Sequence, residues 1–328
     1  MPQFDLPLAD LEAFRPAREE PPDFDSFWAE TLAESRALGW EPRFSRLDPA
    51  DSGLHGIVVE DVTFAGFGGH PVRGWLLRPS GVDHPIPCVV QYIGYNSGRG
   101  FPHQHTLVPS AGLAVFVMDS RGQSSGAFPG STPDPVGAAP HVAGRVSQGI
   151  EAPQSYYYRR LITDAVLAVD AARSHPGIDA ERISVWGGSQ GGAIALAAAG
   201  LCSGLSASFI DFPFLCSIRR AVALTGAAPY AELAAYLQTR RGEEEDVFRT
   251  LSYVDGMNFA ARATAPSLFS VALADTVCPP STVFAAYNHY AGEKRISVYA
   301  FNGHEGGGPY HQLKVLRQLS RAASLPWT

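Results

Sequence analysis

The fold is decided by the stretch Arg182-Ile-Ser-Val-Trp-Gly-Gly-Ser-Gln-Gly-Gly-Ala-Ile-Ala-Leu196, in which a serine lies between a predicted strand and a predicted helix. The residues before the serine are mostly apolar or β-branched, and those after it are strong helix formers. Gly187 and Gly191 flank Ser189 in the pattern G-x-S-x-G, where a side chain at either glycine would crowd a sharp turn. The amides that open the helix point toward the serine oxygen. The pattern favours a nucleophilic serine over the alternative, an ordinary Gly-Ser turn.

The length and composition describe a chain that can bury a large core. It has 328 residues, of which 45% are hydrophobic, which is long for one domain but ordinary for an α/β enzyme with insertions. We therefore expect a single domain, residues 1–328, with additions. The net charge is −7 and no block of basic residues occurs. A neutral or small substrate is expected, and neither nucleic acid nor a membrane surface is expected as a partner.

The sequence shows no targeting pattern and no cysteine framework. The first residues include neither a basic opening nor an apolar segment, so we expect a cytoplasmic protein. The apolar run at residues 193–202 is too short to cross a bilayer. The four cysteines, Cys88, Cys202, Cys216 and Cys278, have no C-x-x-C spacing. We expect reduced thiols rather than disulfides or a zinc site, and no cofactor.

Short apolar segments alternate with helical patterns through most of the chain. The expected strands are residues 87–93, 113–119, 182–186, 206–210, 267–273 and 295–301, preceded by an antiparallel hairpin of residues 57–64 and 72–77 at the sheet edge. Such apolar strands have both faces buried, as in a parallel sheet. The expected helices are residues 157–174, 190–201 and 311–323. This alternation predicts the α/β-hydrolase fold, a mostly parallel, doubly wound sheet.

Three segments are expected to lie outside the alternating pattern. Residues 1–55 form an N-terminal extension, with an amphipathic helix over residues 25–38. Residues 217–263 form a helical insertion, which is either a lid or a subunit contact surface, and its acidic run predicts a solvated helix start. Residues 126–154 are rich in Gly and Pro and are expected to form a long surface loop, a kind of segment that is often functional.

A serine hydroxyl becomes a strong nucleophile only when a base takes its proton, so Ser189 requires a histidine and an acid that orients it. In the predicted fold the acid and then the histidine follow the serine along the chain, each after a strand. Asp275 and His304 each follow one of the predicted strands. Both therefore belong to the same sheet edge as Ser189, and we predict a triad. The competing acid, Asp255, lies in the insertion rather than at a strand end.

Two backbone amides are expected to receive the negative charge that develops on a carbonyl oxygen during attack. One is the amide of Gln190, which directly follows the nucleophile. The other belongs to the turn after residues 87–92, and we assign it to Tyr92, whose side chain is then free to be part of the core.

The other histidines are not expected in the site. His103 and His105 form an H-x-H pair, but no carboxylate or thiolate at a matching spacing completes a metal site. His289 and His311 lie in helical patterns and are expected on the surface or in packing. We therefore predict no metal site.

Several uncommon motifs occur together and in one order along the chain. They are Val90-Gln-Tyr-Ile-Gly-Tyr-Asn96, Arg121-Gly-Gln123, Gly187-Gly-Ser-Gln-Gly191 and His304-Glu305, joined by Ser155-Tyr-Tyr-Tyr-Arg-Arg160, Phe212-Pro-Phe-Leu-Cys216 and Leu273-Ala-Asp-Thr-Val-Cys-Pro-Pro280. Over essentially its whole length the chain resembles carbohydrate esterase family seven, the acetyl xylan esterases and cephalosporin C deacetylases.

The resemblance implies an esterase that removes small O-acetyl groups from xylo-oligosaccharides and from cephalosporin C. It further implies an intracellular homohexamer with its active sites around a central cavity, and subunit contacts and cavity wall from residues 217–263. The triad and the two oxyanion amides are the same residues as those predicted above. Other roles come from the resemblance alone: structural supports beside the site at Arg121, Gln123 and Glu305, borders of the acyl pocket at Phe214 and Pro229, and a thiol close to the site at Cys278.

The chain departs from the family pattern after Arg121-Gly-Gln123, where a glycine and then an aromatic residue are common. Ser124 and Ala127 occupy those positions here, so we expect a roomier acyl pocket. The resemblance also implies transfer of the acyl group to hydrogen peroxide as a side activity. Two alternatives remain open: another serine hydrolase on this fold, such as a peptidase or thioesterase, and a catalytically dead hydrolase used for binding.

Overall fold

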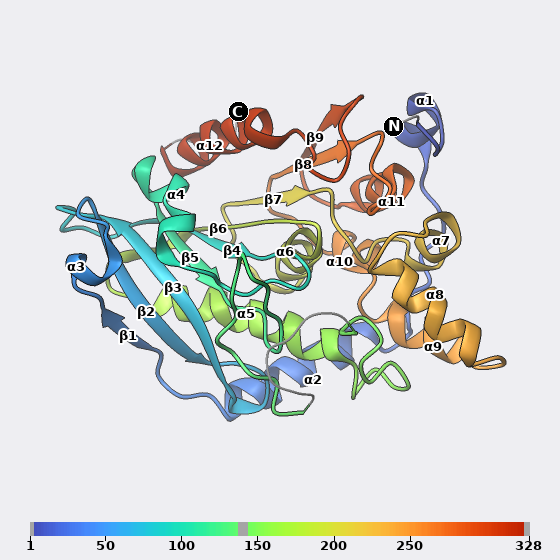
Figure 1. Ribbon diagram of the computed structural model, residues 1–328, viewed down its shortest axis with the longest axis horizontal. Coiled ribbons are helices and arrows are strands. Elements are labelled where there is room, and N and C mark those ends of the chain that lie inside the picture. Colours follow the sequence, from blue (N-terminus) through green and yellow to red (C-terminus); the bar gives the residue numbers. More distant parts are fainter. Residues whose placement is uncertain (1–2, 137–143, 325–328) are drawn as a thin grey trace.

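The computed structural model describes residues 3–136 and 144–324 of the chain. Its central element is a sheet that has nine strands within the described residues, in the order β1-β2-β3-β5-β4-β6-β7-β8-β9 (Figure 1). The strands are β1 (Arg43–Arg46), β2 (Ile57–Ala65), β3 (Pro71–Pro79), β4 (Ile86–Tyr92), β5 (Ala114–Met118), β6 (Ile178–Gly188), β7 (Ala207–Asp211), β8 (Ser267–Ala272) and β9 (Lys294–Tyr299). The pairings from β5 to β9 are all parallel. The predicted doubly wound, mostly parallel sheet is confirmed.

The antiparallel part of the sheet differs from the prediction in one respect. β2 and β3 form the expected antiparallel pair, but β1 pairs with β2 on its outer side, so the hairpin is not at the edge. β1 has the sequence Arg-Phe-Ser-Arg, and three of its four residues are exposed. Because so short and polar a segment has no buried face, its alternation is too weak to mark it as a strand. Backbone pairing with β2 makes it one.

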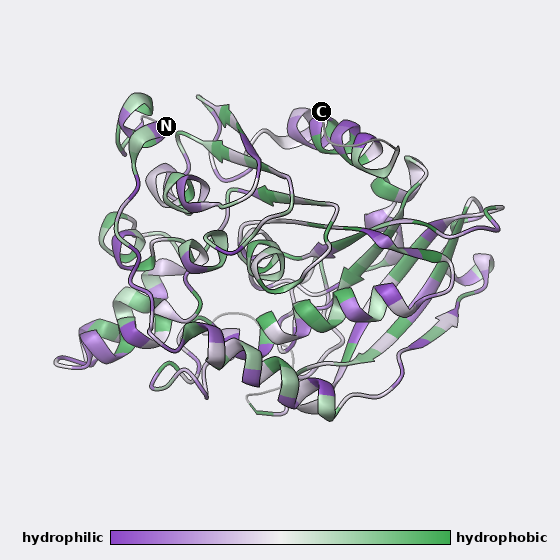
Figure 2. Ribbon diagram, turned by 180° about the vertical axis from the view of Figure 1, so that it is seen from behind, coloured by the Kyte–Doolittle hydropathy of each residue, from purple (hydrophilic) through white to green (hydrophobic). Residues whose placement is uncertain are grey.

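Helices cover both faces of the sheet (Figure 1). One face carries α2 (Phe24–Ala37), α5 (Tyr157–Ser174), α6 (Gln190–Leu201), α10 (Gly256–Ala260) and α11 (Pro280–His289), and the other carries α4 (Leu107–Ser110) and α12 (Gly308–Ser324). Successive side chains of a strand point to opposite faces of the sheet. Phe116 of β5 packs in the core under α5 and α6, whereas Val115 and Val117 pack in the core under α12. Figure 2 shows the resulting concentration of hydrophobic residues in the strands.

The insertion after β7 consists of short helices that pack against the N-terminal segment. It contains α7 (Ile218–Leu224), α8 (Tyr230–Thr239), α9 (Glu244–Ser252) and α10, and α9 begins within the acidic run as predicted. Trp28 of α2 donates a hydrogen bond to the carbonyl of Tyr253 (3.0 Å), and Arg262 forms ion pairs with Glu20 and Asp25. The N-terminal extension, which also contains α1 (Leu8–Ala13) and α3 (Pro49–Ser52), is therefore bound to the insertion as well as to the sheet.

The parallel strands bring the chemically important loops to one edge. In a parallel sheet all carboxyl ends face the same way, and ligands bind beside them. Tyr92 of β4 is in register with Gly187 of β6, and Gly188 with Asp211 of β7. β8 and β9 end beside them at Ala272 and Tyr299.

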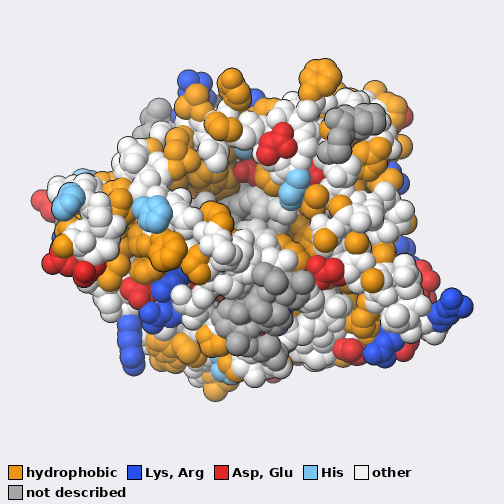
Figure 3. Space-filling view, in the orientation of Figure 1, with side chains coloured by type: hydrophobic (Ala, Val, Ile, Leu, Met, Phe, Trp, Pro, Cys, Tyr) orange, Lys and Arg blue, Asp and Glu red, His pale blue; other side chains and the backbone are white. Residues whose placement is uncertain are grey.

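The surface shows no concentration of charge on the face drawn in Figure 3. Its Lys and Arg side chains lie singly or in small groups among acidic and hydrophobic ones. In the part of the chain that the structure describes, no helix has both the length and the apolar character needed to span a membrane.

Candidate active site

Ser189 lies on the turn between β6 and α6 with backbone angles φ 57° and ψ −120°. A positive φ is costly for a residue with a side chain, and it turns the hydroxyl outward at the strand end. The two flanking glycines make the turn possible. A Cβ added at Gly187 would lie 2.2 Å from the carbonyl oxygen of Gly191, and one added at Gly191 would lie 2.3 Å from that of Tyr92. The serine is therefore in the partly buried, strained turn position that the sequence pattern predicts.

The end of β7 and the residues that follow it stabilise this strained backbone. The amide of Ser189 donates to the carbonyl of Asp211 (3.0 Å), and the amide of Phe214 donates to the carbonyl of Ser189 (2.9 Å). Both peptide groups of the nucleophile are thus held by one neighbouring segment. A residue keeps a strained backbone conformation only where the surrounding structure fixes its peptide groups in this way.

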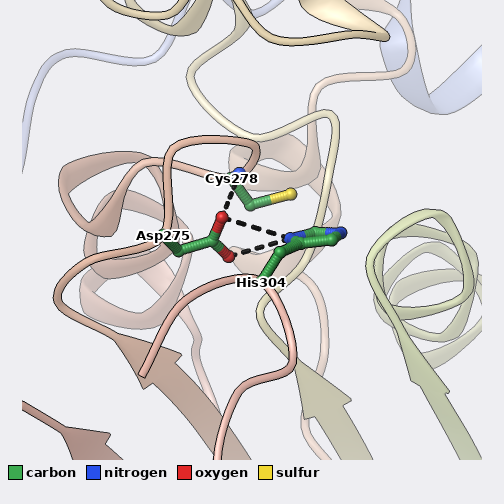
Figure 4. Close-up of side chains that lie close together, drawn as sticks. All are labelled: Asp275, Cys278 and His304. Carbon is green, nitrogen blue, oxygen red and sulfur yellow. Dashed lines mark hydrogen bonds and ion pairs between the residues drawn. The ribbon is translucent and has the colours of Figure 1, made fainter. Parts of the chain in front are cut away.

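Asp275 and His304 meet Ser189 in a continuous chain of hydrogen bonds. The Nε2 of His304 lies 3.0 Å from the Oγ of Ser189, and its Nδ1 lies 2.9 and 3.2 Å from the two carboxylate oxygens of Asp275. Figure 4 shows the imidazole facing the carboxylate. Asp275 is fully buried, whereas the His304 side chain is 34% exposed. The acid is therefore shielded, and the base is open to solvent and to a substrate.

Backbone amides fix the orientation of the acid. The Oδ1 of Asp275 accepts hydrogen bonds from the amides of Val277 (2.8 Å) and Cys278 (3.0 Å). A carboxylate only accepts hydrogen bonds, so the Nδ1 of His304 carries the proton that faces it. In the neutral ring the Nε2 then has a free lone pair directed at the serine hydroxyl. This arrangement can take the hydroxyl proton as the oxygen attacks a carbonyl carbon.

Cys278 lies inside this cluster (Figure 4). Among the described residues, Asp275, Cys278 and His304 form a group whose potential ligand atoms lie within 4.8 Å of one another. A metal would require the thiolate, yet burial raises the pKa of the Cys278 thiol well above its ordinary value. The imidazole and carboxylate already face each other at hydrogen-bond distance. The group therefore fits a hydrogen-bonded acid and base better than a metal site.

The residues assigned to the oxyanion site lie beside the nucleophile. Tyr92 is in register with Gly187, and its carbonyl packs against Gly191. Its side chain points away into the core, where the hydroxyl donates to the carbonyl of Ala165 (2.9 Å). Burial raises the pKa of this phenol well above its usual value. The side chain of Tyr92 thus points into the core and is not available to a substrate. Gln190 begins α6 directly after the serine.

A buried polar network holds the side chain of Gln190. Its Oε1 accepts hydrogen bonds from the Nε2 of Gln123 (2.8 Å) and the hydroxyl of Tyr158 (3.0 Å). Gln123 also accepts from the amide of Asn96 (2.6 Å), a residue in the loop after β4. Gln123 therefore links the two segments that carry the assigned oxyanion amides, which agrees with a supporting role.

The other two residues assigned as supports make local contacts. Arg121 is fully buried and forms a bidentate ion pair with Asp164, with 2.6 Å between Nη2 and Oδ1. Glu305 is exposed and accepts from the side chain of Asn302 (2.9 Å) and the amide of Gly303 (3.1 Å). Glu305 thereby closes the turn that presents its neighbour His304.

The two residues assigned to the acyl pocket lie beside the nucleophile segment and at the start of α8. Phe214 is fully buried, and its ring centroid lies 4.5 Å from that of Tyr230 and 6.4 Å from that of Tyr158. Pro229 precedes Tyr230 at the beginning of α8. The structure thus places Phe214 in an aromatic cluster beside Ser189, and Pro229 directly before Tyr230, a member of that cluster.

The competing residues lie elsewhere. Asp255 caps α10 and accepts from the amides of Ser217 and Ile218 at 3.0 and 2.9 Å. His105 is buried and bonded to the carbonyl of Arg99 (2.7 Å), and burial lowers its pKa. His103 stacks on Phe101. The two members of the H-x-H pair therefore do not face a common ligand.

His289 and His311 are both engaged in packing. The Nε2 of His289 lies 2.7 Å from the carbonyl of Pro16. His311 is buried, and its Nε2 lies 2.6 Å from Asp211.

Two residues beside the triad were not predicted from the sequence. The ring of Phe212 packs edge-on against the His304 imidazole, with 5.2 Å between centroids, and Asp211 holds the Ser189 amide. Both follow the apolar run of β7, so their place at the carboxyl edge was the available signal. Their contacts to the serine and histidine depend on segments far away in sequence.

Comparison with known proteins identifies relatives over the whole chain. Residues 1–322 match the acetyl xylan esterase (AXE1) family. The acetyl xylan esterase from Paenibacillus sp. R4 is 39% identical, with a TM-score of 0.89, covering 96% of this chain and 99% of that one. Acetyl esterase Axe7A of Xylanibacter ruminicola is 24% identical over 305 residues, which are 89% of this chain and 65% of that protein. The chain thus spans less than two thirds of the length of this curated relative.

A more distant likeness concerns the fold alone. The α/β-hydrolase GrgF from Penicillium sp. sh18 has a TM-score of 0.58 at 18% identity, covering 81% of this chain and 99% of that one. The predicted α/β-hydrolase fold is therefore confirmed.

Proposed function

The chain belongs to the acetyl xylan esterase family, and from this premise we propose that it is a serine esterase that removes small acyl groups, acetyl above all, from sugar hydroxyls. The observation that carries the proposal is the pair of contacts made by His304. One ring nitrogen lies 3.0 Å from the Ser189 hydroxyl and the other 2.9 Å from the buried Asp275. A nucleophile, a base and an orienting acid in this order form the arrangement that acyl transfer requires.

The proposed reaction has two halves. The Oγ of Ser189 attacks the acetyl carbonyl carbon while the Nε2 of His304 takes its proton, and the amides of Tyr92 and Gln190 receive the negative charge on the oxygen. His304 then gives the proton to the departing sugar oxygen, which leaves an acetyl-serine. In the second half His304 takes a proton from water, the hydroxide attacks the acetyl carbon, and the proton returns to Ser189 as acetate leaves.

The leaving alcohol is proposed from the names of the relatives. Acetylated xylo-oligosaccharides are the substrates expected of an acetyl xylan esterase. Deacetylation of cephalosporin C and transfer of the acyl group to hydrogen peroxide are further proposed activities. Turnover should be measured on acetylated xylo-oligosaccharides, cephalosporin C and p-nitrophenyl acetate. Release of acetate from none of them would contradict the proposal. A fluorophosphonate probe then distinguishes a different serine hydrolase, which it labels, from a catalytically dead binding protein, which it does not label.

Ala127 is expected to leave room for acyl groups longer than acetyl. Ala127 is exposed on the loop after β5 and stands where relatives commonly have an aromatic residue. A tight pocket discriminates against one methylene by roughly 10- to 200-fold, whereas we expect propionyl turnover within about 5-fold of acetyl turnover here. The measurement is kcat/KM on p-nitrophenyl acetate, propionate and butyrate. Ala127→Trp is the matched variant and should restore steep discrimination; a steep drop in the unaltered enzyme would rule out the roomier pocket.

The assembly is proposed to be a homohexamer with contacts from residues 217–263. Two aromatic side chains outside that segment are also largely exposed, Phe301 at 94% and Tyr310 at 83%, and contact with another copy would remove their apolar surface from water. Light scattering should give a mass near 210 kDa, six times the 35.1 kDa chain. Phe301→Asp should reduce that mass, while the exposed control Leu38→Asp should not. A mass near 35 kDa for the unaltered protein would exclude assembly.

A further inference from the structure

A second histidine and carboxylate pair lies behind the nucleophile. The Nε2 of His311 lies 2.6 Å from the Oδ1 of Asp211, and both side chains are less than 10% exposed. The same carboxylate accepts hydrogen bonds from the indole of Trp186 (2.8 Å) and the hydroxyl of Ser270 (3.0 Å). Asp211 is thus a junction between β6, β7, β8 and α12. The proposed reaction gives this pair no chemical step.

The backbone next to this carboxylate holds the nucleophile. The carbonyl of Asp211 accepts a hydrogen bond from the amide of Ser189 (3.0 Å). The following residue, Phe212, places its ring against the His304 imidazole, and a Cβ added at Gly306 would lie 2.6 Å from that ring. A shift of Asp211 would therefore move the support of the serine and the support of the histidine together.

His311 also closes the loop that carries the base. Residues 300–307 leave the sheet after Tyr299, present His304, and end where α12 begins. The Nδ1 of His311 lies 2.9 Å from the hydroxyl of Tyr299. A hydrogen bond between these two side chains therefore connects the elements on either side of the loop. Because a carboxylate only accepts, the Nε2 of His311 carries a proton toward Asp211, and in the neutral ring Nδ1 accepts from the tyrosine. One ring thereby connects the loop of the base to the strand that holds the nucleophile.

We propose that His311 and Asp211 are a positioning pair that keeps His304 within reach of Ser189. This inference rests on the proposed esterase function for its kinetic test. The pair can hold both parts of the site in place because it is buried and hydrogen-bonded on several sides. It contacts the strand end that holds Ser189 and the base of the loop that carries His304. Neither residue touches the substrate or the reacting atoms.

The test compares two variants of His311. His311→Leu keeps much of the volume and removes both hydrogen bonds, and His311→Gln keeps an amide that can donate to Asp211. A displacement near 1 Å at a reacting group costs on the order of 100-fold in rate, so we expect kcat of His311→Leu on p-nitrophenyl acetate to fall about 10- to 100-fold. KM should change less than about 3-fold, because the acyl pocket is untouched, and His311→Gln should recover kcat to within about 5-fold.

Another buried histidine and carboxylate pair, His175 and Glu60, provides the matched control. His175 lies 3.3 Å from Glu60 far from the site, and the two side chains are 7% and 11% exposed. His175→Leu should lower the thermal midpoint without changing kcat at 25 °C. If His175→Leu reduced kcat as much as His311→Leu does, the effect would be general destabilisation and the positioning role would be wrong. Retention of full kcat by a folded His311→Leu would also overturn it.

A crystallographic readout separates this inference from the function on which it rests. The distance from His304 Nε2 to Ser189 Oγ should lengthen in His311→Leu and return to about 3.0 Å in His311→Gln. If the unaltered protein hydrolyses no ester, the proposed function fails, and an unchanged distance in His311→Leu would independently overturn the positioning role. Asp211→Asn, which preserves shape, replaces His311→Leu under the same criteria if that variant does not fold.

Discussion

Ser189→Ala is expected to lower kcat on acetyl esters about 10⁴- to 10⁶-fold while leaving the fold intact. The Oγ is the only atom removed, and its hydrogen bond is to His304, so the backbone clamp from Asp211 and Phe214 remains. Alanine also keeps the strained turn, although without the hydroxyl no acyl-enzyme can form. The measurements are initial rates on p-nitrophenyl acetate and labelling by a fluorophosphonate, with the thermal midpoint as a check on folding.

The matched control is another serine, directly before a strand of the same sheet. Ser206 precedes β7, and its hydroxyl donates to the carbonyl of Glu181 (3.2 Å) at the surface. Ser206→Ala should be labelled and should turn over esters like the unaltered enzyme. Labelling that persists in Ser189→Ala would place the nucleophile elsewhere.

The central strands were predictable because each carries its own signal. β5, β7 and β8 are buried at every residue, so their sequences are short apolar runs that need no partner to be recognised. β1 lacks such a signal because most of its surface is exposed. It becomes a strand only through pairing with β2, which is a property of two segments and not of one.

The same distinction separates the predicted site residues from the missed ones. Ser189, Asp275 and His304 could be placed because each follows a strand, and strand ends of a parallel sheet share one edge. The Asp211–His311 pair joins β7 to α12 across 100 residues, and nothing in either local pattern indicates the other. The family resemblance assigns Arg121 a structural role, but its ion pair with Asp164 is not indicated by the local pattern around either residue.

Asp275→Asn is expected to lower kcat by roughly 10⁴-fold without unfolding the protein. The reason lies in the two amides of Val277 and Cys278, which both donate to Oδ1. In the asparagine variant the amide oxygen must stay against these donors, so the NH₂ group faces the Nδ1 of His304. That nitrogen is then forced to accept, and the ring proton moves to Nε2. A protonated Nε2 cannot take the proton of Ser189, although every heavy atom remains in place.

Asp255→Asn tests whether this loss comes from the tautomer or from removing any buried carboxylate. Asp255 is also buried, burial raises its pKa to about 6, and its oxygens accept hydrogen bonds from the backbone amides of Ser217, Ile218 and Met257. An asparagine must turn its NH₂ toward at least one of them, which costs about 1–3 kcal/mol of stability. No catalytic atom is touched, so kcat should stay within about 3-fold of the unaltered enzyme. If Asp255→Asn loses activity as Asp275→Asn does, or if Asp275→Asn retains it, the acid has been assigned to the wrong residue.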